Sequence, residues 1–323
     1  MRTGLILSLA LGSAAIASAQ QLQQAPSREA VGDHATLRAA ANTRPDSRGT
    51  GPYPAVRQVD ATLAAHVLYR PADLAALGGR KLGVLVWGNG GCSGDGASAR
   101  FHLAEIASYG YLAIAPGKVL SGPSAPAVPP PPRDAAPRKL AVETGADDVR
   151  AGITWALAEN QRKGSPYYQR IDPRLVAVAG HSCGGLQALQ VAGDPRVHAV
   201  IVHNSGVFTD GSNPIAGMTV DKSLLRTLHT PVLYVLGGAG DVAYPNGTDD
   251  FRKIDHVPAM LLNLPVGHGG TFLDANGGRV ARFAAGWLEW QLRGDKTAAR
   301  LFTGKDCGLC TDAQWTVERR GID

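Results

Sequence analysis

Short apolar runs alternate with amphipathic stretches along most of this chain. The runs are rich in Val, Ile, Leu and Ala, which is typical of strands buried on both faces, and they occupy positions 66–70, 82–87, 111–115, 175–179, 197–202, 231–236 and 259–264. Apolar positions three and four residues apart predict helices over 101–109, after Asp147 and Asp148, after Gly184, and around 280–288. This alternation predicts an α/β fold with a mostly parallel sheet and helices on both faces.

The first 53 residues do not follow this pattern. Positions 1–19 are typical of a secretory signal peptide, with Arg2, a short apolar stretch and the small residues 17–19 before Gln20. Residues 20–53 are rich in Ala, Gln, Arg and Ser without a clear period, so we expect a flexible N-terminus in the mature chain. We interpret residues 54–323 as one domain that ends in a Cys-x-x-Cys tail.

A proline-rich segment interrupts the pattern at 121–138, with four consecutive prolines from Pro129 to Pro132. Four prolines in a row favour an extended segment and exclude a helix. The segment follows a strand, so it could line a site at the end of that strand or contact nothing there. The sequence leaves its role open.

Composition narrows the class of protein further. The 323 residues are 44% hydrophobic, which is enough for a sizeable core, and the net charge of +5 comes from scattered lysines and arginines. Without a basic stripe that carries interleaved aromatic residues, we expect no nucleic-acid partner. No run after the signal peptide is long and apolar enough to predict an integral membrane segment in the mature chain. We therefore expect a secreted or periplasmic protein.

The sequence Gly-His-Ser-Cys-Gly at 180–184 carries the strongest chemical signal. It is the only Gly-x-Ser-x-Gly in the chain, and it lies between the apolar run 175–179 and a stretch that can begin a helix at Gly184. Strand, sharp turn and helix in this order form a nucleophile elbow, which exposes the serine above a sheet. Ser182 is therefore the candidate nucleophile.

A serine hydroxyl needs a base, and the base needs a group that orients it. His268 lies in a Gly-flanked loop after the run 259–264, and Asp241 lies shortly after the run 231–236. Both loops follow strands, where sites form in α/β sheets, and the order Ser, acid, His fits an elbow hydrolase. Alternative acids are Asp249, Asp250 and Asp255. His181 inside the elbow is interpreted as a local packing residue.

Acyl transfer also needs N–H donors for the negatively charged oxygen of its intermediate. One should be the backbone N–H of Cys183, which follows the serine, and the other should come from the glycine-rich loop 88–92. The sequence Trp-Gly-Asn-Gly-Gly at 87–91 resembles the His-Gly-x-Gly-Gly pattern of lipases. By that resemblance Asn89 supplies the second N–H.

These motifs together resemble the α/β-hydrolase superfamily, in particular secreted serine esterases of the lipase, cutinase and dienelactone-hydrolase-like group. The resemblance covers about residues 67–292 and implies a mainly parallel eight-stranded sheet with the triad at its carboxyl edge. Two departures from the family concern the substrate. Cutinase-like polyester hydrolases have an aromatic-Ser-Met elbow, whereas this chain has His181 and Cys183 on either side of Ser182. Dienelactone hydrolases proper use a cysteine nucleophile, whereas Cys183 is one place away from the nucleophile position. The resemblance thus bears on fold and triad rather than on substrate.

The four cysteines are Cys92, Cys183, Cys307 and Cys310. In the superfamily, the strand before the oxyanion loop and the strand before the elbow are neighbours in the sheet. The resemblance therefore implies a Cys92–Cys183 disulfide, with Cys307–Cys310 as a second, local one; two buried free thiols at 92 and 183 remain the alternative. A zinc site is disfavoured because the Cys-x-x-Cys has no second pair of ligands nearby.

We therefore expect a serine hydrolase that cleaves carboxylic esters through an acyl-enzyme, with no cofactor and no metal. A peptidase or acyltransferase could use the same triad, and a non-catalytic binding module on a hydrolase scaffold is the alternative from another class. The substrate, a small-molecule or polymeric ester, and the oligomeric state do not follow from the sequence.

Overall fold

A nine-stranded sheet runs through the computed structural model of this protein, which describes residues 28–126, 141–209, 213 and 215–323. The predicted signal peptide and most of the proline-rich segment lie outside these residues. The strands are β1 (Ala55–Gln58), β2 (His66–Pro71), β3 (Leu82–Gly88), β4 (Tyr111–Pro116), β5 (Ile171–His181), β6 (Ala199–His203), β7 (Val232–Leu236), β8 (Ala259–Asn263) and β9 (Thr316–Arg320). All seven apolar runs of the sequence are strands.

The strand order is β1-β2-β4-β3-β5-β6-β7-β8-β9, and the central pairs from β4 to β8 are parallel. The pairs β1–β2, β2–β4 and β8–β9 at the two edges are antiparallel. The expectation of eight strands was therefore wrong by one, and the sheet is mixed. Strands β1 and β9 read Ala-Val-Arg-Gln and Thr-Val-Glu-Arg-Arg, and such polar edge strands do not form apolar runs.

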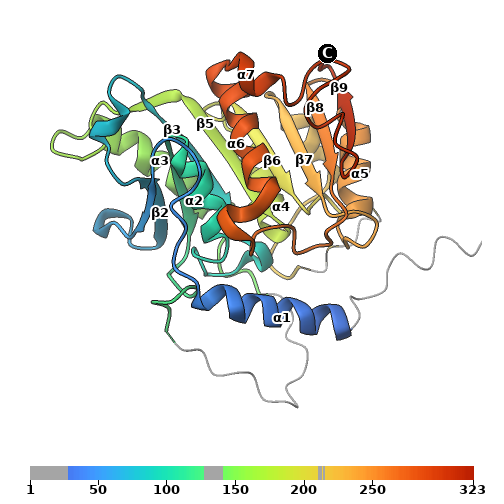
Figure 1. Ribbon diagram of the computed structural model, residues 1–323, viewed down its shortest axis with the longest axis horizontal. Helices are drawn as coiled ribbons and strands as arrows, with labels where there is room; N and C mark the ends of the chain where they lie inside the picture. Colours follow the sequence, from blue (N-terminus) through green and yellow to red (C-terminus); the bar gives the residue numbers. More distant parts are fainter. Residues whose placement is uncertain (1–27, 127–140, 210–212, 214) are drawn as a thin grey trace, which may run out of the picture.

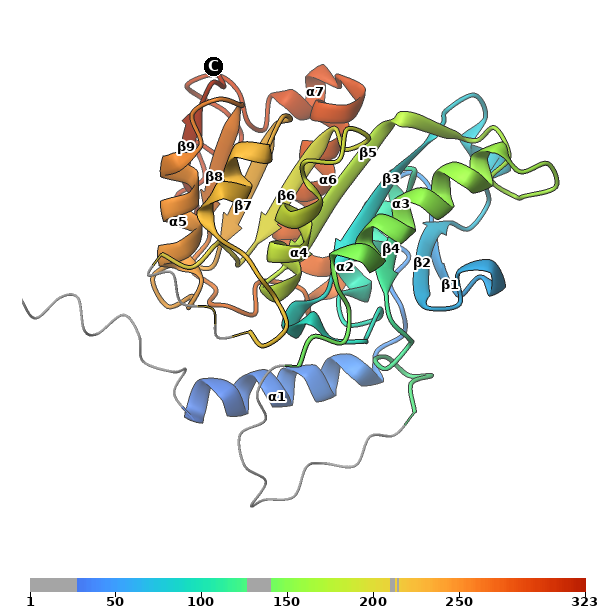
Figure 2. The same cartoon turned by 180° about the vertical axis from the view of Figure 1, so that it is seen from behind.

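Helices cover both faces of the sheet, as the alternating pattern predicts. Figure 1 shows α2 (Arg100–Ser108) and α6 (Gly278–Arg293) on one face, and Figure 2 shows α3 (Ala146–Gln161), α4 (Cys183–Val191) and α5 (Tyr244–Lys253) on the other. Two separate apolar cores follow, one on each side of the sheet. In the strands that both cores share, side chains alternate between them: Val84 and Val86 face one core, and Leu85 and Trp87 the other.

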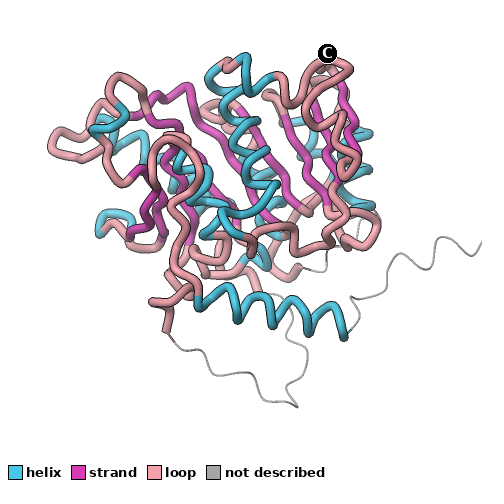
Figure 3. Tube along the Cα trace, viewed as in Figure 1, coloured by secondary structure: helices cyan, strands magenta, loops and turns pink. Residues whose placement is uncertain are grey.

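The N-terminal segment differs from the sequence-based expectation. Residues Arg28–Thr43 form a helix, α1, and residues 44–53 make backbone hydrogen bonds such as Tyr53 N–H to Ser108 O. Helix α1 lies across the carboxyl ends of the parallel strands, with loops between it and the sheet (Figures 1 and 3). The segment 35–42 contains four alanines, the best helix formers, so propensity outweighs the missing apolar period there.

The chain ends beside the outer strand of the sheet. The short helix α7 (Lys296–Ala299) follows α6, and the Cys307–Cys310 disulfide lies between α7 and β9. This bond was expected and is confirmed. Within the described ranges, no helix is long and apolar enough to cross a membrane.

Candidate active site

Ser182 lies at a sharp turn between β5 and α4, as the elbow pattern predicts. Its backbone has φ 54° and ψ −121°, a conformation that side-chain-bearing residues rarely adopt. Added Cβ atoms at Gly180 and at Gly184 would each lie 2.0 Å from a backbone oxygen, of Gly184 and of Gly88 respectively. The two flanking glycines are therefore required by close backbone contacts as well as by the turn.

His268 connects Ser182 to Asp241. The Nε2 atom of His268 lies 2.9 Å from Oγ of Ser182, and its Nδ1 lies 2.7 Å from Oδ1 of Asp241. Ser182 follows β5, Asp241 follows β7, and His268 follows β8, so three strands of one parallel sheet bring the side chains to the same edge. The three residues proposed from sequence are thus within hydrogen-bonding distance in the order Ser–His–Asp.

The Asp241 carboxylate is buried and held by several donors. Its Oδ1 also accepts the N–H of Ala243 at 2.9 Å, while its Oδ2 accepts the N–H of Gly237 at 2.9 Å and the Nδ2–H of Asn204 at 2.8 Å. Burial raises the pKa of Asp241, but the contacts with His268 and the two backbone N–H groups outweigh it, so the pKa is lowered overall. Asp241 is therefore held ionised beside the imidazole.

The alternative acids lie elsewhere. Asp249 and Asp250 both pair with Lys222, at 2.7 and 2.6 Å. Asp255 is exposed beside His256, 3.6 Å away. None of the three hydrogen-bonds to His268 among the described residues, so the geometry favours Asp241.

A cavity of about 820 Å³ opens over the triad and is lined by Ser182 and His268. Trp87, His181 and Phe272 also line it. Two further buried histidines pack against Trp87. The centroid of its ring lies 5.2 Å from that of His102 and 5.5 Å from that of His203. Burial lowers the pKa of His102 to about 3, so this ring is neutral and acts as a packing group.

Two backbone elements at the cavity could bind a developing oxyanion. Cys183 is the first residue of α4, and a helix leaves its first N–H groups without intrahelical acceptors. Gly90 and Gly91 line the cavity in the turn that follows β3. These N–H groups are candidate donors on two sides of Ser182.

Asn89, the donor proposed from sequence, occupies a different place. It is fully buried, and its side chain donates to the carbonyls of Ser93 at 2.9 Å and Pro116 at 2.7 Å. Its backbone nitrogen packs against Gly184, where an added Cβ would lie 2.6 Å away. The Asn89 side chain thus holds the loop in place, and the N–H groups of Gly90 and Gly91, which line the cavity, are further candidates beside that of Asn89.

The Cys92–Cys183 disulfide joins these two elements, as the resemblance implied. Cys92 ends the turn that contains Gly90 and Gly91, and Cys183 follows the serine. Strands β3 and β5 are adjacent, with Gly88 opposite Gly180, which brings the two cysteines together. The alternative of two free thiols was wrong.

Three contributions to this site were not found from the sequence. His181 contacts the His268 loop, Asn204 holds Asp241, and α1 places Arg38 and Asn42 on the cavity wall. Asn204 has φ 45°, a conformation for which Asn is favoured, but its position after β6 is the only sequence signal. Among the described residues, no group of His, Cys, Asp and Glu could hold a metal ion.

Comparison with models of known protein families and with curated proteins finds no match to this chain. What this protein can do is therefore inferred from the geometry of the site.

Proposed function

We propose that this protein is a serine hydrolase that cleaves carboxylic esters, with Ser182 as nucleophile, His268 as general base and Asp241 as the orienting acid. The observation that carries the proposal is the Ser182–His268–Asp241 relay at a strained elbow, with a cavity above it. A buried carboxylate, an imidazole and a hydroxyl that lines a cavity, in this order, meet the geometric requirements for nucleophilic catalysis.

Acylation begins when Oγ of Ser182 attacks the ester carbonyl carbon and His268 Nε2 takes the hydroxyl proton. The carbonyl oxygen becomes an oxyanion that the N–H groups of Cys183 and Gly91 can bind. The ion pair with Asp241 stabilises the imidazolium. His268 then gives its proton to the alcohol oxygen as the carbon–oxygen bond breaks, which leaves an ester on Ser182.

Deacylation repeats these steps with water. His268 Nε2 takes a proton from water, whose oxygen attacks the acyl carbon, and the second oxyanion occupies the same N–H groups. Collapse of this intermediate releases the carboxylic acid and returns the proton to Oγ of Ser182. The His268 side chain is 35% exposed, so water can reach it.

Two disulfides are compatible with a protein that works in an oxidising compartment outside the cytoplasm. The proposal therefore includes export, directed by residues 1–19.

Labelling with a fluorophosphonate probe tests the nucleophile. We expect the probe to label the wild-type protein on Ser182 and to leave Ser182→Ala unlabelled. Hydrolysis of acyl esters of graded chain length, aryl esters and polyesters then tests the reaction, with matched amides and added alcohol acceptors to separate a peptidase or an acyltransferase. A folded wild-type protein that is neither labelled nor active would favour the binding-module alternative.

A further inference from the structure

The N-terminal arm, residues 28–46, forms one side of the cavity that contains Ser182. Arg38 and Asn42 of α1 both line this cavity. They are four residues apart, so they lie on the same face of the helix. By contrast, Leu37 is 60% exposed and is not among the lining residues. One face of α1 is therefore turned toward the active site.

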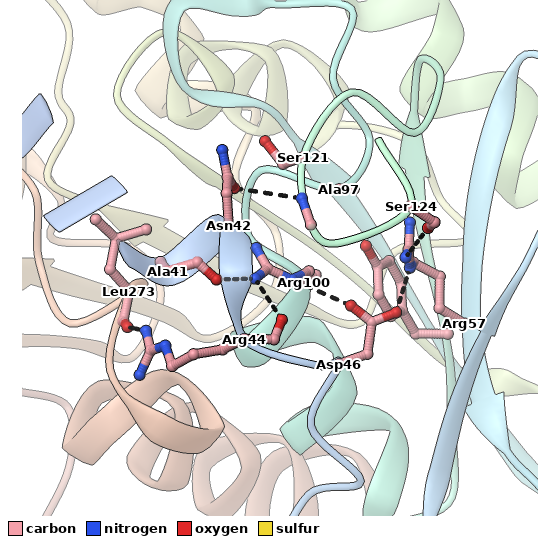
Figure 4. A network of polar contacts seen from close by, with 12 residues as sticks. Ala41, Asn42, Arg44, Asp46, Arg57, Ala97, Arg100, Ser121, Ser124 and Leu273 are labelled. Atoms are coloured by element: carbon pink, nitrogen blue, oxygen red, sulfur yellow. Dashed lines mark hydrogen bonds and ion pairs between the residues drawn. The ribbon is translucent and has the colours of Figure 1, made fainter. Parts of the chain in front are cut away.

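A buried arginine fixes this arm to the domain (Figure 4). Arg100 on α2 is 1% exposed, pairs with Asp46 at 3.1 Å and donates to the carbonyl of Ala41. Arg44 donates to the carbonyl of Leu273, which lines the cavity close to His268 in sequence. Buried charges that are paired in this way persist because breaking the pair leaves an uncompensated charge. The end of α1 is thus held in place over the site.

Polar side chains outside the triad also line the cavity, beside apolar ones such as Leu120 and Leu273. We call Arg38, Asn42, Ser93, Asp95, Ser98 and Glu143 the polar wall; all six line the cavity. The wall offers both donors and acceptors, and its formal charge is −1, from one arginine and two carboxylates. Asp95 already accepts hydrogen bonds from the N–H groups of Ala97 at 3.0 Å and Leu120 at 3.1 Å. These two bonds fix the orientation of its carboxylate.

This composition discriminates between substrate classes. A long aliphatic chain would displace water from the polar wall without replacing the hydrogen bonds of that water, which costs free energy. An anionic group would face Asp95 and Glu143 together, and like charges disfavour binding. Hydroxyl groups both donate and accept, so they match a wall that mixes amide, hydroxyl, guanidinium and carboxylate groups.

We propose that the cavity selects esters in which one half is a neutral, polyhydroxylated ring, such as a sugar or a cyclitol, and that Arg38 and Asn42 bind its hydroxyl groups. This inference rests on the proposed ester hydrolysis. It assigns the N-terminal arm to substrate selection, whereas the triad performs the chemistry.

Two matched pairs of substrates test the selection. Cyclohexyl acetate and mono-O-acetyl-inositol differ in the hydroxyl groups of the alcohol half; methyl cyclohexanecarboxylate and its tetrahydroxylated analogue differ in the acyl half. We expect kcat/KM, measured by acid release, to be at least tenfold higher for the hydroxylated member of one pair. Equal or lower values for the hydroxylated members of both pairs would overturn the inference and leave ester hydrolysis intact. No turnover of any ester would contradict the proposed function itself.

Variants of the arm test the residues. Each of Arg38→Ala and Asn42→Ala should lower the hydroxylated-to-plain ratio of kcat/KM about fivefold, which is the loss expected for one hydrogen bond. Leu37→Ala, on the outer face of the same helix, is the matched control and should leave the ratio unchanged. A ratio that stays constant in both cavity-facing variants would exclude the arm from selection.

Discussion

The imidazole of His181 donates a hydrogen bond from Nε2 to the backbone carbonyl of His268, 2.8 Å away. The two rings lie 5.2 Å apart, and the His181 ring also packs 4.7 Å from Phe272. An added Cβ at Gly90 would lie 2.5 Å from Nδ1 of His181. His181 thus contacts the loop of His268 and the turn at Gly90 as well as its own elbow, so it does more than the local packing expected from sequence.

His181 is therefore expected to act as a positioning residue. His181→Phe keeps a ring against Phe272 but loses the donor, so the His268 loop can shift; displacement by about 1 Å can cost about a hundredfold. We expect kcat to fall about tenfold or more with little change in KM. His181→Gln can restore the donor and should recover part of kcat. Equal losses in both variants would point to packing alone.

Removal of the triad side chains should abolish turnover. We expect losses on the order of a million-fold in kcat for Ser182→Ala and His268→Ala, and about ten-thousand-fold for Asp241→Asn. Steady-state kinetics with an activated ester provides the measurement, and circular dichroism checks the fold. Asp255→Asn, an exposed carboxylate away from His268, is the control. A larger loss in that variant than in Asp241→Asn would show that the acid is misassigned.

Asn204 should help to keep the pKa of Asp241 low. Its Nδ2–H donates to the charged Asp241, so removing it raises the pKa of that carboxyl. We expect Asn204→Gly, which tolerates the positive φ, to lower kcat about tenfold and to move the acid limb of the pH–rate profile to higher pH. Asn276→Gly makes the same change at φ 53°, away from Asp241, as a control. An unmoved acid limb in Asn204→Gly would argue against this role of Asn204.

The Cys92–Cys183 disulfide should support turnover as well as stability. Its cysteines are 91 residues apart, so the chain-entropy model gives about 4–5 kcal/mol of stabilisation. The double variant Cys92→Ala/Cys183→Ala should lose activity below its unfolding temperature, because the two candidate oxyanion elements are no longer joined. The Cys307–Cys310 bond closes only a short loop, so Cys307→Ala/Cys310→Ala should keep full turnover. If Cys92→Ala/Cys183→Ala loses activity only as it unfolds, the bond contributes to stability and not to turnover.

Asp250 should govern part of the pH dependence of stability. Burial raises its pKa to about 6 from 3.8, despite its pairing with Lys222. The folded protein then binds the proton more tightly than the unfolded chain, so the free energy of unfolding falls as pH rises from about 4 to about 6. Asp250→Asn removes this effect and should lessen the drop in Tm over that range by several degrees.

Asp249 provides a control of opposite sign. Burial raises its pKa, but hydrogen bonds to Lys222 and Lys253 outweigh it and lower the pKa overall. Its contribution to stability is therefore present above its unfolded pKa and is lost in acid. Asp249→Asn should lower Tm at neutral pH more than at pH 3, as thermal unfolding at several pH values can measure. The same pH trend in both variants would contradict these two assignments.

The sequence predicted the central strands and the three positions that meet at the candidate site, because both depend on local patterns. A buried strand such as 82–87 needs apolar residues on both faces, and an elbow needs glycines at 180 and 184. Both requirements are therefore visible in the local sequence. Edge strands such as β1 and β9 have no apolar run that would predict them, since one side of each strand has no neighbouring strand and polar residues are tolerated there.

Other parts depend on contacts between distant residues. Whether Asn89 or Gly91 reaches the cavity is decided by how the turn packs against Gly184, which no local pattern encodes. The place of α1 is decided by Arg100, more than fifty residues later in the chain. These features follow only when the folded backbone brings the partners together.

The bond between Cys92 and Cys183 also has a consequence for where and when the protein works. The two cysteines hold together the parts that would stabilise the transition state, and their bond forms only where thiols are oxidised. If the proposed ester hydrolysis holds, a newly made chain in a reducing cytoplasm would keep two thiols and a loosened candidate oxyanion site, so it would spare the esters of the cell that makes it. For the proposed exported hydrolase, oxidation after export would then complete the site, and its activation would coincide with its delivery.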